Sequence, residues 1–598
     1  MDRFETHEHD VLVIGAGGAG LRAAIEAAAE GARVGLICKS LLGKAHTVMA
    51  EGGVAAALGN IYPEDNWRVH FRDTMRGGKM LNNWRMAMLH AQEAPDRVKE
   101  LEGWGALFDR TKDGRILQRD FAGHRYARLA HVGDRTGLEM IRTLQQHGVA
   151  LGFDVFMECT VTRLLKDGDR ISGACGYWRE SGRFVVFRAK AVILATGGIG
   201  KAYKVTSNSW EYTGDGQALA YHAGADLIDM ECVQFHPTGM VWPLSVRGIL
   251  VTEAVRGEGG ILRNSAGERF MFRYVPELFR ADTADTEAEA DRWYTDKKNN
   301  RRPPELLPRD EVARAIVAEV KAGRGSPHGG VFLDIATRRD PEFIRRKLPS
   351  MYHQFKELAD VDITKQPMEV GPTCHYIMGG VRVDADTAAA TVPGLFAAGE
   401  VAGGLHGSNR LGGNSLSDLL VFGRRAGLAA AGYAKRLPRA PAVAEGEVER
   451  LAREMLAPLE RSTGESPYAI QEALQEAMEA NVGIVRTEDE LRKGLEAIEE
   501  FKQRLRQVKA VGTRQYNPGW HTALDLWSLL TVSEAIIRGA LERKESRGGH
   551  TRLDYPKADP QFGKVNVVVR KEGDRMTVAR EPLPEMPREL QALFEGDK

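Results

Sequence analysis

The chain has 598 residues, of which 43% are hydrophobic and 27% charged, and its 82 basic side chains balance its 82 acidic ones. This length is several times the ~150 residues of a typical domain, and the balanced charge excludes a strongly basic class of nucleic-acid-binding protein. The five cysteines are dispersed without a CxxC pair, which excludes a zinc knuckle or a ferredoxin-type iron–sulfur cluster held by this chain and is typical of a reducing compartment.

Residues 1–10 are polar and acidic, so we expect neither a signal peptide nor a transit peptide. No apolar run reaches the ~18 residues of a membrane-spanning helix. We therefore expect any association with a membrane to come through a partner.

Residues 11–38 read as a strand, a glycine-rich turn, a helix and a second strand. In the turn, Gly15 permits a tight bend, Gly17 lets the backbone approach a pyrophosphate, and Gly20 allows the helix to pack on the strand. The segment predicts a dinucleotide site. Residues 38–40 (Cys-Lys-Ser) stand where an ordinary NAD site has an acidic ribose ligand, which counts against NAD.

Two further strand-plus-glycine elements lie far along the chain, at residues 191–198 and 394–400, and the second leads into an apolar helix at 416–431. Three such elements so far apart predict one nucleotide-binding domain built from separated segments, with an inserted domain between the last two. Within the insert, residues 281–308 are polar, and the basic, proline-rich part at 297–304 predicts an exposed loop.

Beyond Pro438 the character of the sequence changes. Residues 445–461, 470–508 and 521–543 place apolar side chains at three- and four-residue spacing with charges between them, which predicts a bundle of amphipathic helices. The tail at 544–598 has frequent prolines and short β-like runs.

Residues 44–53 (Lys-Ala-His-Thr-Val-Met-Ala-Glu-Gly-Gly) contain His46. By spacing alone, His46 is an ordinary histidine in a glycine-rich surface loop. Together with residues 64–67 (Glu-Asp-Asn-Trp), however, the segment resembles the flavin-attachment segment of succinate dehydrogenase and fumarate reductase flavoprotein subunits. The resemblance implies that His46 is bonded covalently to the 8α-methyl carbon of FAD, a link that raises the flavin potential enough for succinate to reduce it.

The resemblance extends along most of the chain, and Ala122 stands where this family usually has glycine. It implies an α/β fold, with a Rossmann-like FAD-binding domain, an inserted α+β capping domain, a helical bundle domain and a small C-terminal domain. We predict boundaries at 1–241 with 353–437, at 242–352, at 438–543 and at 544–598, in that order. The matching motifs lie at residues 118–123, 134–137, 195–198, 213–216, 234–239, 250–260, 308–310, 372–376, 406–415 and 544–550.

Succinate and fumarate are small dianions, so a selective pocket needs cations or donors at both carboxylates. Arg410 can offer a bidentate fork to one carboxylate. Taken singly, His236 could be a turn residue and Arg410 a surface charge, but the joint pattern favours a substrate site. The substrate-binding residues carried over by resemblance are Phe121, His236, Thr252, His375 and Arg410.

The resemblance implies that Arg309 transfers the proton that accompanies hydride exchange with flavin N5. A guanidinium stays protonated, so this role requires a fast relay to other groups. Glu253 and Arg256 match the relay of the family. Ala254 and Val255 stand where many members have Gly-Cys, so the reactive thiol of those relatives is absent while the relay charges are kept.

Glu400 matches the residue that binds the FAD ribose in the family, which compensates for the missing acid after the second strand. We predict no metal site. The predicted cofactor-binding residues are His46, Gly15, Gly17, Gly20, Lys39, Ser40, Gly53, Gly197, Asp215, Glu400, Ser415 and Leu416.

No redox centre in the chain can carry away the two electrons of each turnover. The resemblance therefore implies an iron–sulfur partner subunit, membrane anchor subunits that pass electrons to quinone, and a place on the cytoplasmic face of a bacterial inner membrane.

Three alternatives stay open. Glu51 stands where fumarate reductases often have Glu and dehydrogenases often have Gln, so the physiological reaction could be fumarate reduction. An L-aspartate oxidase or soluble fumarate reductase relative would share the fold, but those lack the attachment histidine. A binding or assembly protein without catalysis is disfavoured by retention of the substrate and relay residues together.

Overall fold

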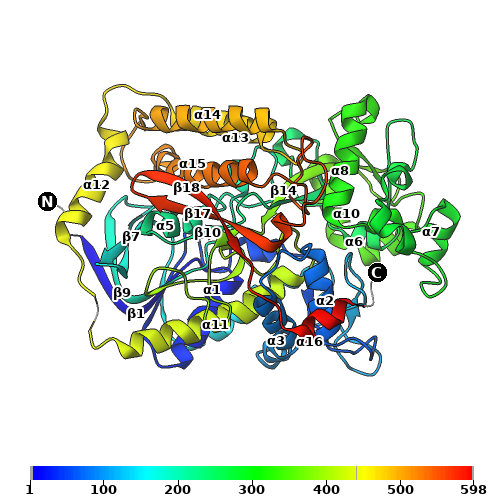
Figure 1. The fold of residues 1–598 in the computed structure, drawn as a ribbon, viewed down its shortest axis with the longest axis horizontal. Helices are drawn as coiled ribbons and strands as arrows, with labels where there is room; N and C mark the ends of the chain where they lie inside the picture. Colours follow the sequence, from blue (N-terminus) through cyan, green and yellow to red (C-terminus); the bar gives the residue numbers. More distant parts are fainter. Residues whose placement is uncertain (1–3, 440, 596–598) are drawn as a thin grey trace.

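The computed structural model describes residues 4–439 and 441–595 and is built around a seven-stranded sheet (Figure 1). Its strand order is β6-β2-β1-β9-β8-β7, and β16 pairs with β9. The strands are β1 (Glu5–Ile14), β2 (Val34–Ile37), β6 (Asp154–Phe156), β7 (Cys159–Asp167), β8 (Arg170–Trp178), β9 (Phe184–Leu194) and β16 (Leu395–Ala397).

The three strand-plus-glycine elements meet in this sheet, as predicted. β9 pairs in parallel with both β1 and β16, so Val192 lies opposite Leu12 on one strand and Leu395 on the other. The glycine turn leads from β1 into helix α1 (Gly18–Ala29), which packs against helix α11 (Asn414–Arg436). The separated segments therefore form one unit with one shared core.

Strand β1 starts earlier than predicted. Its backbone from Glu5 onward pairs with β9, although the first residues are polar. Alternate side chains in this part of the strand are exposed, so a ladder of backbone hydrogen bonds forms without an apolar pattern. The polar N-terminal segment is therefore a strand from Glu5, and residues 1–3 lie outside the described chain.

The inserted region has its own sheet and a separate hydrophobic cluster between Met240 and Val370. Figure 1 shows it on one side of the molecule, with helices α6 (Ala254–Gly257), α7 (Glu287–Trp293), α8 (Arg309–Glu319) and α10 (Pro349–Ala359). The sheet order is β11-β14-β13-β12, formed by β11 (Val233–Met240), β12 (Ile261–Arg263), β13 (Val331–Asp334) and β14 (Met368–Ile377).

The exposed loop predicted at 297–304 is only partly exposed. Residues 297–299 face solvent, whereas Pro303 and Pro304 are buried. The burial follows from Glu305, whose carboxylate pairs with the buried Arg269 (2.7 Å) and holds this end of the loop inside the insert. The prediction of an exposed loop was therefore wrong for its second half.

The predicted helices beyond Pro438 are present as α12 (Glu445–Glu460), α13 (Pro467–Asn481), α14 (Glu488–Leu505) and α15 (Pro518–Glu542). Helices α13, α14 and α15 lie side by side (Figure 1), and α15 is the most buried of them. The tail adds a hairpin of β17 (Val565–Glu572) and β18 (Arg575–Pro582), in which β17 pairs with β10 (Leu227–Ile228). The boundaries of the four domains remain predictions.

Arg543 ties the end of the helical region to the nucleotide-binding part. Its guanidinium is fully buried and contacts the carboxylates of Asp229 (2.9 Å), Glu231 and Glu545 (3.1 Å). Residues far apart in sequence thus share one buried charge cluster.

All five cysteines are free and buried. In the part of the chain that the structure describes, no group of His, Cys, Asp and Glu side chains is arranged to hold a metal ion. Nor does any helix within residues 4–439 and 441–595 combine the length and apolar character that crossing a membrane requires.

Candidate active site

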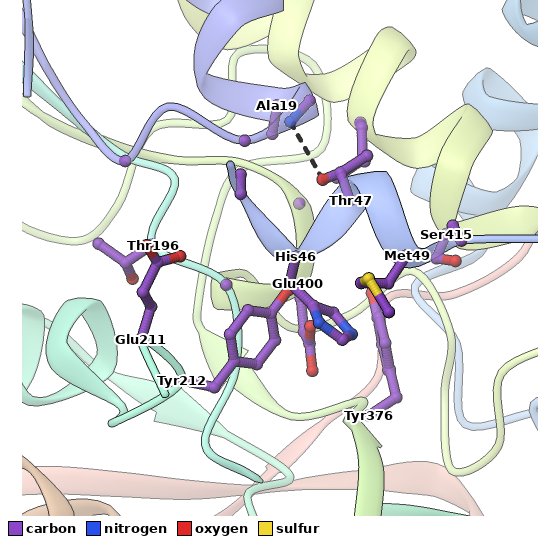
Figure 2. Close-up of a pocket in the computed structure, with 18 of the residues that line it drawn as sticks. Ala19, His46, Thr47, Met49, Thr196, Glu211, Tyr212, Tyr376, Glu400 and Ser415 are labelled. Atoms are coloured by element: carbon purple, nitrogen blue, oxygen red, sulfur yellow. Dashed lines mark hydrogen bonds between the residues drawn. The ribbon is translucent and has the colours of Figure 1, made fainter. Parts of the chain in front are cut away.

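One large cavity lies where the three separated segments converge, with the glycine turn at one part of its wall and the inserted region at another. Figure 2 shows His46, Tyr212, Glu400, Tyr376 and Ser415 gathered around it from different elements. The cavity is therefore bounded by both the nucleotide-binding sheet and the insert.

The glycine turn is shaped by close backbone contacts. Gly15 has φ +107°, and a Cβ there would lie 2.2 Å from the Ala195 carbonyl oxygen. A Cβ on Gly20 would lie 1.8 Å from the Gly15 oxygen, so Gly20 lets α1 approach β1. Gly17, in contrast, lines the cavity, and a Cβ there would meet only Thr47 Oγ1 at 3.4 Å and the Ala45 side chain at 3.6 Å. The N-terminus of α1 thus presents open backbone to a ligand phosphate.

His46 begins a short 3-10 helix (His46–Met49) on the cavity wall. Its ring lies edge-on to Tyr212 at 4.8 Å, and its Nε2 lies 3.3 Å from the Asn208 amide nitrogen. Burial lowers the pKa of His46 to about 4. The ring is therefore neutral near pH 7 and keeps one nitrogen lone pair.

Lys39 and Asp215 line the cavity and bind each other. The Lys39 ammonium donates to Asp215 (2.9 Å), Thr213 (2.8 Å) and Asp525 (2.8 Å). Asp525, on α15, had no signal in the sequence. This buried group joins the helical region to the end of the cavity beside β7.

Glu400 follows β16 in a 3-10 turn and also faces the cavity. Its Oε1 accepts a hydrogen bond from the Ile377 backbone N–H (3.1 Å). Burial raises the pKa of Glu400 to about 8. The carboxyl group is thus positioned to bond to a hydroxyl group of a ligand.

On the side of the cavity nearest the inserted region, two arginine and two histidine side chains lie close together. The pairing of β11 with β14 brings the rings of His236 and His375 to 5.3 Å. Arg309 enters at the first residue of α8. Arg410 donates from Nη1 to Ser415 Oγ (2.8 Å). Burial, and then the charges of Arg309 and its neighbours, hold the pKa values of His236 and His375 well below the ordinary value, so both are neutral beside two guanidinium groups.

Glu253 lies between two arginines. Its Oε2 is 3.0 Å from Arg309 Nε and 3.8 Å from Arg256 Nη2, and its Oε1 accepts from the Ala122 backbone N–H (3.1 Å). Burial alone would raise the pKa of Glu253, but the two guanidinium charges outweigh it and lower that pKa. Arg256 is fully buried and donates to the Glu305 carbonyl oxygen (2.6 Å). Together, Arg309, Glu253 and Arg256 form a continuous chain of charges.

Several buried polar atoms on the cavity wall have no hydrogen-bond partner among the described residues. They are His46 Nδ1, Glu51 Oε2, His236 Nε2 and Arg410 Nε. Buried polar groups are almost always satisfied, so these atoms point to a polar ligand. Their spread from His46 to Arg410 fits a flavin lying beside a dicarboxylate, and the open backbone at Gly17 fits the pyrophosphate of FAD.

Most residues predicted from the sequence meet at this cavity. Gly20 and Arg256 lie behind its wall, one packing the turn and the other contacting Glu253. The predicted residues that line it are Gly15, Gly17, Lys39, Ser40, His46, Gly53, Phe121, Gly197, Asp215, His236, Thr252, Glu253, Arg309, His375, Glu400, Arg410, Ser415 and Leu416.

The predicted set lacks Tyr212, Gln234 and Asn208, which also contact the site. Tyr212 lines the cavity directly before the 213–216 motif. Gln234 lies inside a matched motif, two positions before His236, and contacts both Arg309 and Arg410. Asn208 contacts His46 and lay in no quoted motif, so no signal marked it.

Comparison with known proteins identifies the family. Residues 10–416 match the model of an FAD binding domain, and residues 471–591 match that of the fumarate reductase flavoprotein C-terminal region. The chain is 44% identical over 570 residues to a subunit of the fumarate reductase (CoM/CoB) of Methanothermobacter marburgensis, covering 95% of this chain and 98% of that protein. It is 37% identical to the succinate dehydrogenase flavoprotein of Coxiella burnetii, over 94% of each.

Among solved structures, Mycobacterium smegmatis Sdh1 in complex with UQ1 is similar with a TM-score of 0.88 and 59% identity, covering 99% of this chain and 97% of that one. The predicted fold class and the predicted FAD cofactor are thereby confirmed. The chain belongs to the family of succinate dehydrogenase and fumarate reductase flavoprotein subunits.

Proposed function

We propose that this protein interconverts succinate and fumarate at FAD, as the catalytic flavoprotein of a respiratory complex. The observation that carries the proposal is the meeting, in one cavity, of a dinucleotide-type glycine turn with two buried guanidinium groups and two neutral imidazoles. Arg410 complements one carboxylate of a small dianion with a charged donor, and the imidazoles beside it offer hydrogen bonds to the rest of the substrate.

FAD supplies hydride transfer when bound. The residues of the chain would bind the substrate and transfer the proton. Arg410 holds one carboxylate, while His236, Thr252 and His375 donate to the substrate and Phe121 covers it. Arg309 transfers the proton to or from the carbon next to the reacting one. Glu253 and Arg256 return Arg309 to its starting state through their contacts of 3.0 and 3.8 Å.

We propose that His46 carries the flavin through a covalent bond. Its place on the cavity wall and its neutral ring, which keeps one nitrogen lone pair, support this role. The test is to denature the protein and look for flavin fluorescence on the chain. Release of all flavin would remove the covalent bond and favour an L-aspartate oxidase or a soluble fumarate reductase.

We further propose a partner with iron–sulfur clusters and a membrane anchor that passes electrons to quinone, on the cytoplasmic face of a bacterial inner membrane. Each oxidation of succinate would leave two electrons on the flavin, so the proposed reaction needs an electron acceptor outside the substrate cavity. The solved complex of Sdh1 with UQ1 supports quinone as that acceptor. Co-purification of an iron–sulfur protein with the tagged chain would test this, and a chain isolated alone from membranes and cytosol would contradict it.

Physiological fumarate reduction is the second candidate. Glu51 on the cavity wall favours it, because fumarate reductases often have Glu where dehydrogenases often have Gln. Burial, and then the Asp134 charge, raise the pKa of Glu51 to about 8. The Methanothermobacter relative is named a fumarate reductase. Flavin bleaching by succinate and reoxidation by fumarate, measured on one preparation, would give the ratio of the two rates and decide the direction.

A further inference from the structure

Asn208 is a buried amide that contacts two residues of the proposed site at once. Its Nδ2 lies 3.0 Å from the His375 carbonyl oxygen and 3.3 Å from His46 Nε2. None of the catalytic and binding roles above uses Asn208, so its burial beside His46 calls for an explanation.

The orientation of this amide follows from its partners. A carbonyl oxygen only accepts hydrogen bonds, so the amide nitrogen of Asn208, not its oxygen, faces His375. The same nitrogen faces His46. Its second N–H therefore donates to Nε2, and the neutral ring carries its proton on Nδ1.

The backbone beneath Asn208 is held firmly. The Thr206 hydroxyl donates to the Cys374 carbonyl oxygen (2.9 Å), and the Ser207 N–H donates to the same oxygen (3.0 Å). The Asn208 oxygen occupies the space beside Gly200, where a Cβ would come within 2.0 Å of it. Turning the amide over would place its oxygen against the His375 carbonyl oxygen and break the 3.0 Å hydrogen bond from Nδ2.

We infer that Asn208 is a positioning residue for covalent flavin attachment, holding His46 as the tautomer whose Nε2 is the nucleophile. The inference rests on the proposed attachment at His46. On attachment, Asn208 would give up its 3.3 Å contact with Nε2 and would keep its bond to the His375 carbonyl oxygen.

The attachment step balances within the proposed chemistry. A bond forms between Nε2 and the 8α carbon. One 8α proton and the Nδ1 proton are released, and the isoalloxazine gains the electron pair and two protons. Fumarate, the acceptor of the proposed reaction, then takes two electrons and two protons to become succinate and returns the flavin to its oxidised state.

Asn208→Asp is the sharpest variant. Aspartate has the same shape but no N–H, so it repels the His375 carbonyl and can only accept from His46, which moves the ring proton to Nε2. We expect FAD to remain bound at wild-type stoichiometry, while the flavin fluorescence retained by the denatured chain falls at least tenfold. Ser207→Ala is the matched control, because Ser207 contacts His375 and not His46, and it should keep full attachment.

Asn208→Ala supplies a second measurement if the aspartate variant fails to fold. Flavin-free chain is mixed with FAD and fumarate, and the rate of attachment is followed on denaturing gels. We expect at least a tenfold slower rate, and attachment at the wild-type rate in either variant would overturn the inference. Wild-type protein that itself releases all its flavin on denaturation would instead remove the proposed attachment, and this inference with it.

Discussion

Arg309 and Arg410 meet at a single neutral oxygen. Arg309 Nη1 and Arg410 Nη2 both donate to Gln234 Oε1, at 3.4 and 3.1 Å. The Gln234 amide nitrogen donates to Asn409 Oδ1 and to the Arg410 carbonyl oxygen, each at 2.8 Å, which fixes the direction of the amide. A neutral acceptor thus orients two like charges without adding a negative charge between them. Arg309 also pairs with Glu253 (3.0 Å), so Arg410 is the cation left for a carboxylate of the substrate.

Gln234→Glu should weaken dicarboxylate binding. A carboxylate at this point would neutralise the arginines and compete with the substrate, so we expect the KM for fumarate to rise at least tenfold while FAD stays bound. Steady-state kinetics and flavin absorbance measure the two effects. Gln475→Glu, on α13, is the control and should leave the KM unchanged. An unchanged KM in the Gln234 variant would contradict the role given to the two charges.

Arg309→Lys should abolish turnover and leave FAD in place. Lysine keeps a positive charge but cannot hold both the Glu253 contact and the proton-transfer geometry, so we expect activity to fall at least a thousandfold, about 4 kcal/mol in barrier. Fumarate-dependent reoxidation of reduced flavin is the measurement. Arg314→Lys on the same helix, which pairs with Glu311 and not Glu253, should retain activity. Normal turnover in the Arg309 variant would remove it from the acid role.

Gly17 and Gly20 should respond differently to alanine. A Cβ on Gly20 meets the Gly15 oxygen at 1.8 Å, so Gly20→Ala should prevent folding, whereas Gly17→Ala should fold and bind FAD at least tenfold more weakly. Both are best made in a His46→Ala background, where FAD binding is expected to be reversible and a Kd can be measured. Tight FAD binding by the Gly17 variant would place the pyrophosphate elsewhere.

Arg543→Met should destabilise the protein strongly. It would leave the carboxylates of Asp229 and Glu231 buried without their cation, a change that typically costs about 3–5 kcal/mol, whereas Glu545 would keep its pair with Arg547 (2.8 Å). The unfolding midpoint and the soluble yield measure it. Arg580→Met removes an exposed pair with Glu542 and should cost less than about 1 kcal/mol. Equal effects of the two variants would argue against the buried cluster as a stabilising contact.

His222 should contribute to acid sensitivity. Its ring stacks on Trp527 at 4.0 Å, and burial, followed by the Arg163 charge, lowers its pKa to about 3. Because the folded state keeps this ring neutral while the unfolded chain takes up a proton below pH ~6.5, stability falls as the pH drops through that value. His222→Phe keeps the stacking and should reduce the stability lost between pH 7 and 5 by up to about 2 kcal/mol.

The measurement is the free energy of unfolding at the two pH values. His353→Phe, at an exposed position, is the control and should lose as much stability as the wild type. A His222 variant that loses the same amount as the wild type would mean that its ring is not kept neutral by folding.

The parts of the site that sequence reasoning found are those with a local pattern. The Gly15–Gly20 spacing and the apolar strands predict the nucleotide fold, because turn geometry and burial act within a few residues. The partners of these residues were not predictable in the same way. Lys39 meets Asp525 across 486 positions, and only the packing of α15 on the sheet brings them together. The sequence around Asn208 and Gln234 does not indicate a role for either amide, because their contacts with His46, Arg309 and Arg410 form only in the folded structure. The strand from Glu5 was missed because its order comes from pairing with β9 and not from its side chains.

The cavity wall is assembled from residues between Ile14 and Leu419, and its last members lie on α11. A chain leaving the ribosome therefore holds no complete flavin pocket until more than two thirds of it has been made. Gly15 and His46 are synthesised early, but they form a closed cavity wall only after β16 and α11 have been made. We therefore expect FAD to bind late in synthesis. A fragment that ends before α11 has the glycine turn but lacks the complete cavity that would retain FAD.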